Sequence, residues 1–199
     1  MISGTPYCSL HRKIPGTARA LLVVVFLLFQ QQASPQTITD SVKESVPVTL
    51  HTKTGNIEGT LTIPIAVKHM PLALIIAGSG ATDRDCNGPL IKTDAYKQLA
   101  HALAQHKIAT LRYDKRGVGK SMAAMKSEKD LRFDDYVEDV REWIDLIRQD
   151  KRFTRIILIG HSEGGIIAPL IASQRADIKF VVMLAGPAIK IIDLMEQQN

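Results

Sequence analysis

The stretch IILIGHSEGG, from Ile156 to Gly165, decides the fold class of this chain. Four apolar residues run directly into a turn of small residues centred on Ser162, and an apolar segment at 165–173 has the composition of a short helix. A continuous apolar run that ends at glycine is typical of a strand buried on both faces, as in a parallel sheet covered by helices. The stretch therefore predicts a strand, a tight turn and a helix in succession.

The rest of the chain repeats this alternation of strands and helices. Apolar runs at 71–78, 108–114 and 179–186 predict three more buried strands, and helical spacing predicts helices over 93–107 and 132–150. Thr93 or Asp94 is expected to cap the first helix. Two short strands at 46–52 and 55–64 are predicted to form a hairpin that turns at Gly55–Asn56. Together these elements predict an α/β fold with a mostly parallel, doubly wound sheet.

The N-terminus has the pattern of a secretory signal peptide. Arg12, Lys13 and Arg19 flank or precede the apolar run at 20–29, which polar and small residues follow. Ten apolar residues are too few to cross a bilayer, so no stable membrane span is expected. The sequence predicts a signal peptide over 1–33, a linker over 34–44, a folded domain over 45–199, and export of the mature chain. Cleavage would remove Cys8 and leave Cys86 without a partner for an internal disulfide.

The charge of the chain does not favour a nucleic-acid ligand. The formal net charge is +5, but residues 34–199 hold 22 basic and 20 acidic side chains. No basic block of the length expected for a nucleic-acid arm occurs in that part of the chain. Nucleic acid is therefore not expected as a partner.

The turn around Ser162 has the spacing of a nucleophile elbow, G-x-S-x-G. A nucleophile on so sharp a turn takes a strained backbone conformation, and Gly160 and Gly164 let the neighbouring chain pass without a side-chain clash. The helix that begins there directs N–H groups, that of Glu163 first, at developing negative charge. The plain alternative is a helix-capping serine. His161 adjoins the nucleophile on the same turn and is expected to be structural.

Two nucleotide-binding patterns fail on inspection. The segment GVGKS at 117–121 ends like a phosphate loop, but the first glycine of that motif is replaced by Asp114. A dinucleotide fingerprint that starts at Gly78 and Gly80 has Asp83 where its third glycine is required. A carboxylate at these positions would repel phosphate.

Three stretches resemble the α/β-hydrolase superfamily, and more narrowly its exported esterase and serine-aminopeptidase-like branch: IIAGSGATDRD, LRYDKRGVGKS and ILIGHSEGG. The resemblance extends from about residue 45 to the C-terminus and implies a sheet of order 1-2-4-3-5-6-7-8, truncated here after the sixth strand. It implies that the N–H of Ser79, or alternatively of Gly80, joins that of Glu163 in an oxyanion hole. It also implies that Asp114 and Arg116 brace the site, and that no metal or cofactor takes part.

The resemblance also shows what this sequence lacks. The family places an acid and then a histidine after the serine, but no histidine follows Ser162. His51, His69, His101 and His106 lie upstream and are expected to be surface residues. We therefore expect a serine hydrolase of carboxylic esters that works through an acyl-enzyme and is incomplete in this chain. A serine-aminopeptidase-like peptidase and a non-catalytic remnant are the alternatives. The expected partner is a small ester or acyl compound.

Overall fold

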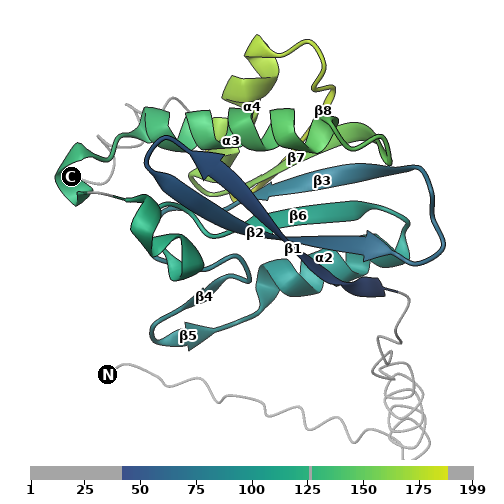
Figure 1. Ribbon diagram of the computed structural model, residues 1–199, viewed down its shortest axis with the longest axis horizontal. Helices are drawn as coiled ribbons and strands as arrows, with labels where there is room; N and C mark the ends of the chain where they lie inside the picture. The colour runs from purple at the N-terminus through teal and green to yellow at the C-terminus, as the bar shows by residue number, and fades with distance from the viewer. Residues whose placement is uncertain (1–41, 126, 188–199) are drawn as a thin grey trace, which may run out of the picture. The chain divides into compact units, whose positions relative to one another are not determined.

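The computed structural model describes residues 42–125 and 127–187 (Figure 1). The predicted signal peptide at 1–33 and almost all of the predicted linker at 34–44 lie outside the described residues. Within the described residues, no helix has the length and apolar composition that crossing a membrane requires.

The predicted sheet is confirmed. Six strands pair in the order β1-β2-β6-β3-β7-β8, which is the order that the resemblance implies for the first six strands. β2 pairs antiparallel with β1 and β6, whereas β6, β3, β7 and β8 run parallel. The strands are β1 (Val42–Thr52), β2 (Gly55–Pro64), β3 (Met70–Ile76), β6 (Ala109–Tyr113), β7 (Phe153–His161) and β8 (Phe180–Leu184).

Three helices follow the strands of the parallel part, as predicted. Figure 1 shows α2 on one side of the sheet and α3 on the other. A small hairpin, β4 (Asn87–Gly88) with β5 (Ile91–Lys92), precedes α2 and was not predicted. Two 3-10 turns, η2 (Gly119–Ala124) and η3 (Glu128–Asp130), lie between β6 and α3. The helices are α2 (Ala95–Gln105), α3 (Phe133–Arg148) and α4 (Gly164–Gln174).

The side chains of β3 alternate between two apolar cores. Leu72, Leu74 and Ile76 pack in the larger core, with side chains from α3 and α4. Ala73 and Ile75 pack in the smaller core, to which α2 contributes. Because successive side chains of a strand point to opposite faces, both faces of β3 are buried, and this explains its continuous apolar sequence.

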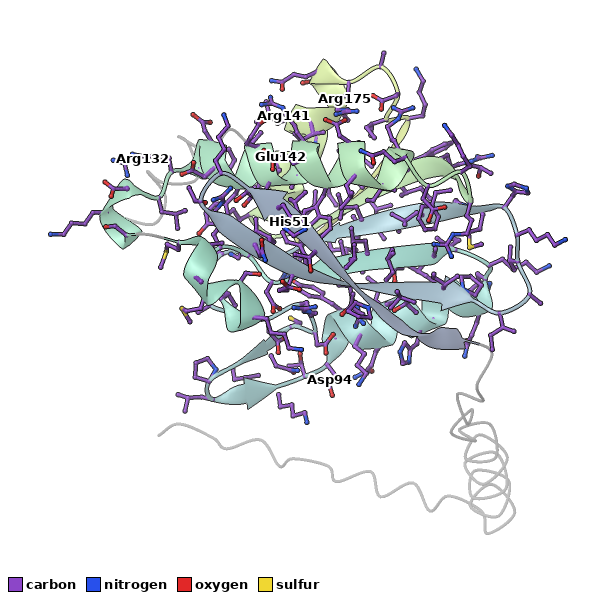
Figure 2. All side chains as sticks on the ribbon, in the orientation of Figure 1. His51, Asp94, Arg132, Arg141, Glu142 and Arg175 are labelled. Atoms are coloured by element: carbon purple, nitrogen blue, oxygen red, sulfur yellow. The ribbon has the colours of Figure 1, made fainter. Side chains whose placement is uncertain are left out.

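Three details differ from the sequence-based predictions. The β1–β2 hairpin turns at Lys53–Thr54, and Gly55 is already the first residue of β2. A Cβ at Gly55 would lie 2.9 Å from the Cα of Ala124. The glycine is therefore needed for the close approach of β2 to η2, and not for the hairpin turn. Of the two residues expected to cap α2, Thr93 accepts the Ala95 N–H on its hydroxyl oxygen at 3.3 Å, whereas Asp94 makes no capping bond and accepts the Asn87 side-chain amide at 2.7 Å (Figure 2). Phe133 falls at the apolar helical spacing of the segment 132–150, which predicts burial, but it is 40% exposed.

Much of β8 is exposed, as expected for the last strand of a sheet truncated after its sixth strand. It pairs with β7 on one side and is the last strand of the described sheet. The side chains of Phe180, Val182 and Met183 are each more than 40% exposed. An apolar strand edge with free backbone groups is a template for pairing between chains.

We therefore expect this chain to self-associate when it is produced alone. Light scattering should report oligomers or aggregates, and Val182→Lys should lower the associated fraction because a charge on an edge strand opposes pairing. A monodisperse monomer of the unchanged chain would contradict this expectation.

Candidate active site

Ser162 stands between the end of β7 and the start of α4. Its φ angle is 51°, in the left-handed region that a non-glycine residue rarely adopts. The backbone is held there by two hydrogen bonds: the Ser162 N–H donates to the carbonyl of Leu184 at 2.9 Å, and the Ser162 carbonyl accepts the N–H of Gly165 at 2.8 Å. A strained turn that is fixed by two backbone hydrogen bonds is the geometry predicted for a nucleophile elbow.

The two glycines of the motif are required by close backbone contacts. A Cβ at Gly160 would lie 2.0 Å from the carbonyl oxygen of Gly164. A Cβ at Gly164 would lie 2.3 Å from the carbonyl oxygen of Ile76, at the end of β3. No side chain fits at either position. The two glycines of the motif therefore allow the backbones of β7, α4 and β3 to pass close to one another.

The loop after β3 lies directly against the serine. A Cβ at Gly78 would approach the Ser162 Cβ to 3.1 Å, so the missing side chain lets the loop backbone reach the turn. Gly78 is buried, whereas Ser79 and Gly80 are exposed, and Gly80 has a φ of 86°. The structure thus brings the predicted loop of the oxyanion hole beside Ser162.

Glu163 immediately precedes α4. Its backbone N–H donates to no acceptor found among the described residues, and the same holds for Ser79. Each therefore has a donor available to a bound anion. The Glu163 side chain turns inward, and its buried Oε1 has no hydrogen-bond partner within the described part of the chain.

His161 bonds away from the serine. Its Nδ1 lies 2.8 Å from the hydroxyl of Tyr96, which comes from the first turn of α2. The Tyr96 hydroxyl also accepts the N–H of Gly78 at 3.4 Å. Burial raises the pKa of Tyr96 to about 12, so the phenol stays protonated at neutral pH. This tyrosine links the elbow to the loop after β3, and the sequence analysis did not single it out.

Lys115 is a second residue that the sequence analysis missed. It is 5% exposed, and its Nζ donates to the carbonyl oxygen of Gly78 at 2.6 Å. The ammonium lies 5.2 Å from the ring centre of Tyr136. Burial lowers the pKa of Lys115, and the negative charge of Glu163 partly opposes that shift.

Ion pairs brace the loop between Gly78 and α2. Arg84 binds Asp114 at 2.7 Å, and Arg112 binds Asp85 at 2.6 Å. Asp83 accepts the backbone N–H groups of residues 85 and 87. The prediction that Asp114 supports the site is consistent with this network, which also holds residues 83–85.

Asp114→Asn is expected to destabilise the protein by about 3 kcal/mol, because it leaves Arg84, whose side chain is 12% exposed, without its charge partner. Burial alone would raise the pKa of Asp114, but hydrogen bonds from Arg84 and the Lys120 N–H outweigh it and lower that pKa. The ion pair therefore contributes its full stability above about pH 4 and loses it as the pH falls through the lowered folded-state pKa.

Urea unfolding of both proteins as a function of pH measures this effect. The free-energy difference between wild type and Asp114→Asn should be constant near neutrality and shrink below pH 4. A difference that stays the same down to pH 2 would contradict the assignment.

Arg116 and Cys86 both lie in loops near the site. Arg116 donates to the carboxylate of Asp139, which is 1% exposed on α3, and so ties the loop after β6 to that helix. Cys86 has a φ of 72°, a conformation that favours glycine. The Cys86 thiol is free among the described residues.

Neither a metal site nor a histidine base is found at Ser162 within the described residues. No group of three potential metal ligands occurs in residues 42–125 and 127–187. His51 bonds Asn56 on the β1–β2 hairpin, and its label in Figure 2 marks that position. His69 and His106 are exposed, as expected. A cavity of about 320 Å³ lies between α3 and the sheet, but Ser162 is not among its lining residues.

Comparison with known proteins identifies the family. Residues 86–198, more than half of the chain, match the model of the family described as serine aminopeptidase, S33. The chain belongs to this family. It is an α/β hydrolase.

Individual relatives agree with this assignment. The chain is 31% identical over 147 residues to the esterase EstD of Thermotoga maritima, an alignment that covers 72% of this chain and 34% of that protein. It is 31% identical over 119 residues to the monoglyceride lipase of Mus musculus, an alignment that covers 60% of this chain and 36% of that protein. The chain thus spans about a third of the length of these curated relatives.

The solved structures show the same fold. XC6422 from Xanthomonas campestris, described as an α/β serine hydrolase without a lid, superposes with a TM-score of 0.56 at 22% identity. That alignment covers 73% of this chain and 63% of the other. GrgF, an α/β hydrolase from Penicillium, gives a TM-score of 0.59 at 18% identity and covers 72% and 46% of the two chains.

Proposed function

We propose that the protein hydrolyses carboxylic esters with Ser162 as nucleophile. The observation that carries the proposal is the strained φ of 51° at Ser162, held between Gly160 and Gly164 with Gly78 packed against the serine. Attack of Oγ on the ester carbonyl would expel the alcohol and leave an acyl-enzyme, which water then hydrolyses. An esterase and a monoglyceride lipase among the relatives support an ester as the substrate.

The oxyanion of the tetrahedral intermediate would be bound by two backbone N–H groups. We assign these to Ser79 and Glu163, with Gly80 as the alternative on the loop side. Supporting this assignment, Gly78 lies against Ser162 and neither donor is used by another described residue. Two preorganised donors stabilise the charge that develops on the carbonyl oxygen without any need for a metal.

The base that activates Ser162 is proposed to come from outside these 199 residues. The sequence has no histidine after Ser162, and the His161 ring is engaged with Tyr96. In the α/β-hydrolase order the acid and the histidine follow the serine. The coding sequence downstream of codon 199 tests this point: an acid and then a histidine in frame support it, and their absence favours a non-catalytic remnant.

A peptidase is the second candidate, because the matching family model is described as a serine aminopeptidase. An aminopeptidase must hold the free α-amino group of its substrate. Assays of the full-length protein on p-nitrophenyl acetate and on alanine p-nitroanilide separate the two activities. The proposal predicts turnover of the ester and little or none of the anilide, and a preference for the anilide would favour the peptidase.

We also propose that the protein is exported through residues 1–33, on the basis of the sequence pattern alone. N-terminal sequencing of the mature protein tests this, since a start near residue 34 is expected and an intact Met1 would contradict it.

A further inference from the structure

Two buried side chains hold the backbone of Gly78, the residue before Ser79. Lys115 donates to the Gly78 carbonyl oxygen at 2.6 Å, and the Gly78 N–H donates to the Tyr96 hydroxyl at 3.4 Å. The two side chains come from different parts of the chain, Lys115 from the loop after β6 and Tyr96 from the start of α2. Both polar groups of Gly78 are therefore fixed from outside the loop after β3.

The contact at the carbonyl also orients the next N–H. No cis peptide bond occurs among the described residues, so the Gly78–Ser79 peptide is trans and planar. In a trans peptide the C=O and the N–H point in opposite directions. An ammonium bound to the Gly78 oxygen consequently directs the Ser79 N–H away from Lys115, toward the opposite edge of the same peptide group. The positive charge also polarises the peptide and makes its N–H a better donor.

The environment of Lys115 favours this role over a purely stabilising one. Burying an ammonium is costly unless it is well paired, and an apolar side chain of the same volume would fill the space at less cost. Glu163 is the carboxylate whose negative charge acts on Lys115, but the two form no ion pair within the described residues. The close polar contact of Lys115 is the Gly78 carbonyl, beside Ser162.

We propose that Lys115 is a positioning residue that orients and polarises the Gly78–Ser79 peptide, with Tyr96 on the other side of Gly78, so that the Ser79 N–H stabilises the oxyanion. This inference rests on the proposed function, and it goes beyond it by making a buried charge part of the oxyanion hole. Lys115 itself touches neither the substrate nor the reacting atoms.

Lys115→Met keeps the length of the side chain and removes the ammonium, so it tests the role directly. In the full-length protein we expect kcat for p-nitrophenyl acetate to fall about 10²-fold, as when one oxyanion donor is lost. KM should stay within about 3-fold, because the contact is made in the transition state. The Ki of a trifluoromethyl ketone, whose adduct places an oxyanion in the hole, should rise in parallel with the loss of kcat.

Lys120→Met is the matched control, since Lys120 is an exposed lysine on the same loop. It should keep the wild-type kcat and Ki. A folded Lys115→Met protein with unchanged kcat, or with a raised KM alone, would overturn the inference. If the wild-type protein itself neither hydrolyses esters nor binds the ketone, the proposed function fails and this inference fails with it.

A second variant and a readout independent of activity cover the case in which Lys115→Met does not fold. Tyr96→Phe keeps the ring and removes the hydroxyl that accepts the Gly78 N–H, so kcat should fall by about 10-fold with KM unchanged. Carbonyl ¹³C labelling of glycine in the full-length protein should show the Gly78 signal of Lys115→Met moved upfield relative to Lys120→Met. Wild-type kcat in Tyr96→Phe, or an unmoved Gly78 signal, would overturn the proposed orientation of the peptide.

Discussion

Replacing Ser162 by alanine is expected to lower kcat for ester hydrolysis by about 10⁶-fold in the full-length protein, because no other group can take over the nucleophilic attack. Residual turnover of about 10³-fold over water would remain from the oxyanion hole and from binding. The structure supports so large an effect, since the strained turn, the two glycines and the loop at Gly78 all converge on this one side chain. Initial rates on p-nitrophenyl acetate measure it.

Ser173→Ala is the control for this prediction. Ser173 is exposed near the end of α4, where its hydroxyl donates to the carbonyl of Leu170 within the same helix. This variant should keep the wild-type rate and the wild-type melting temperature. Equal activity of the wild type and Ser162→Ala would rule out Ser162 as the nucleophile.

Replacing Gly160 by alanine is expected to destabilise the fold by about 4 kcal/mol or more. The added Cβ would lie 2.0 Å from the Gly164 carbonyl oxygen and 2.7 Å from the backbone nitrogen of Gly165. These are backbone atoms, which cannot move aside as a flexible side chain would, so β7 and α4 must separate. Such a loss is a large fraction of the stability of a typical domain. Urea unfolding followed by circular dichroism measures it.

Gly88→Ala is the matched control, because a Cβ at Gly88 would meet only the Thr82 side chain, at 3.9 Å. It should change the free energy of unfolding by less than about 1 kcal/mol. If Gly160→Ala were as stable as Gly88→Ala, the close crossing of β7 and α4 would be contradicted.

The sheet and its helices could be predicted from the sequence because their patterns are local. The apolar run of β7 reflects a strand that is buried on both faces. The helical spacing of apolar residues in α3 reflects a helix that is buried on one face. The β4–β5 hairpin has two residues in each strand, too short for any period to show. The position of the β1–β2 turn was missed because Gly55 serves a contact with η2 that lies far away in the sequence.

Only those residues of the site that belong to a recognisable sequence motif could be predicted. Ser162 was found because the glycines on either side of it mark a close backbone approach, and the loop at Gly78 was found through the resemblance to the α/β hydrolases. Lys115 and Tyr96 carry no such mark, and their importance appears only when the fold brings both to Gly78. The partner of Arg84 was also missed, since Asp114 lies on a different element and no short-range pattern joins the two.

The most direct test of the central claim is the reaction of the full-length protein with a fluorophosphonate, followed by mass spectrometry of its tryptic peptides. A serine reacts with this probe only when its hydroxyl is activated. The account predicts one adduct, on the peptide that contains Ser162, and its loss in Ser162→Ala. An unlabelled protein, or a label on a different serine, would contradict the assignment of Ser162 as the nucleophile.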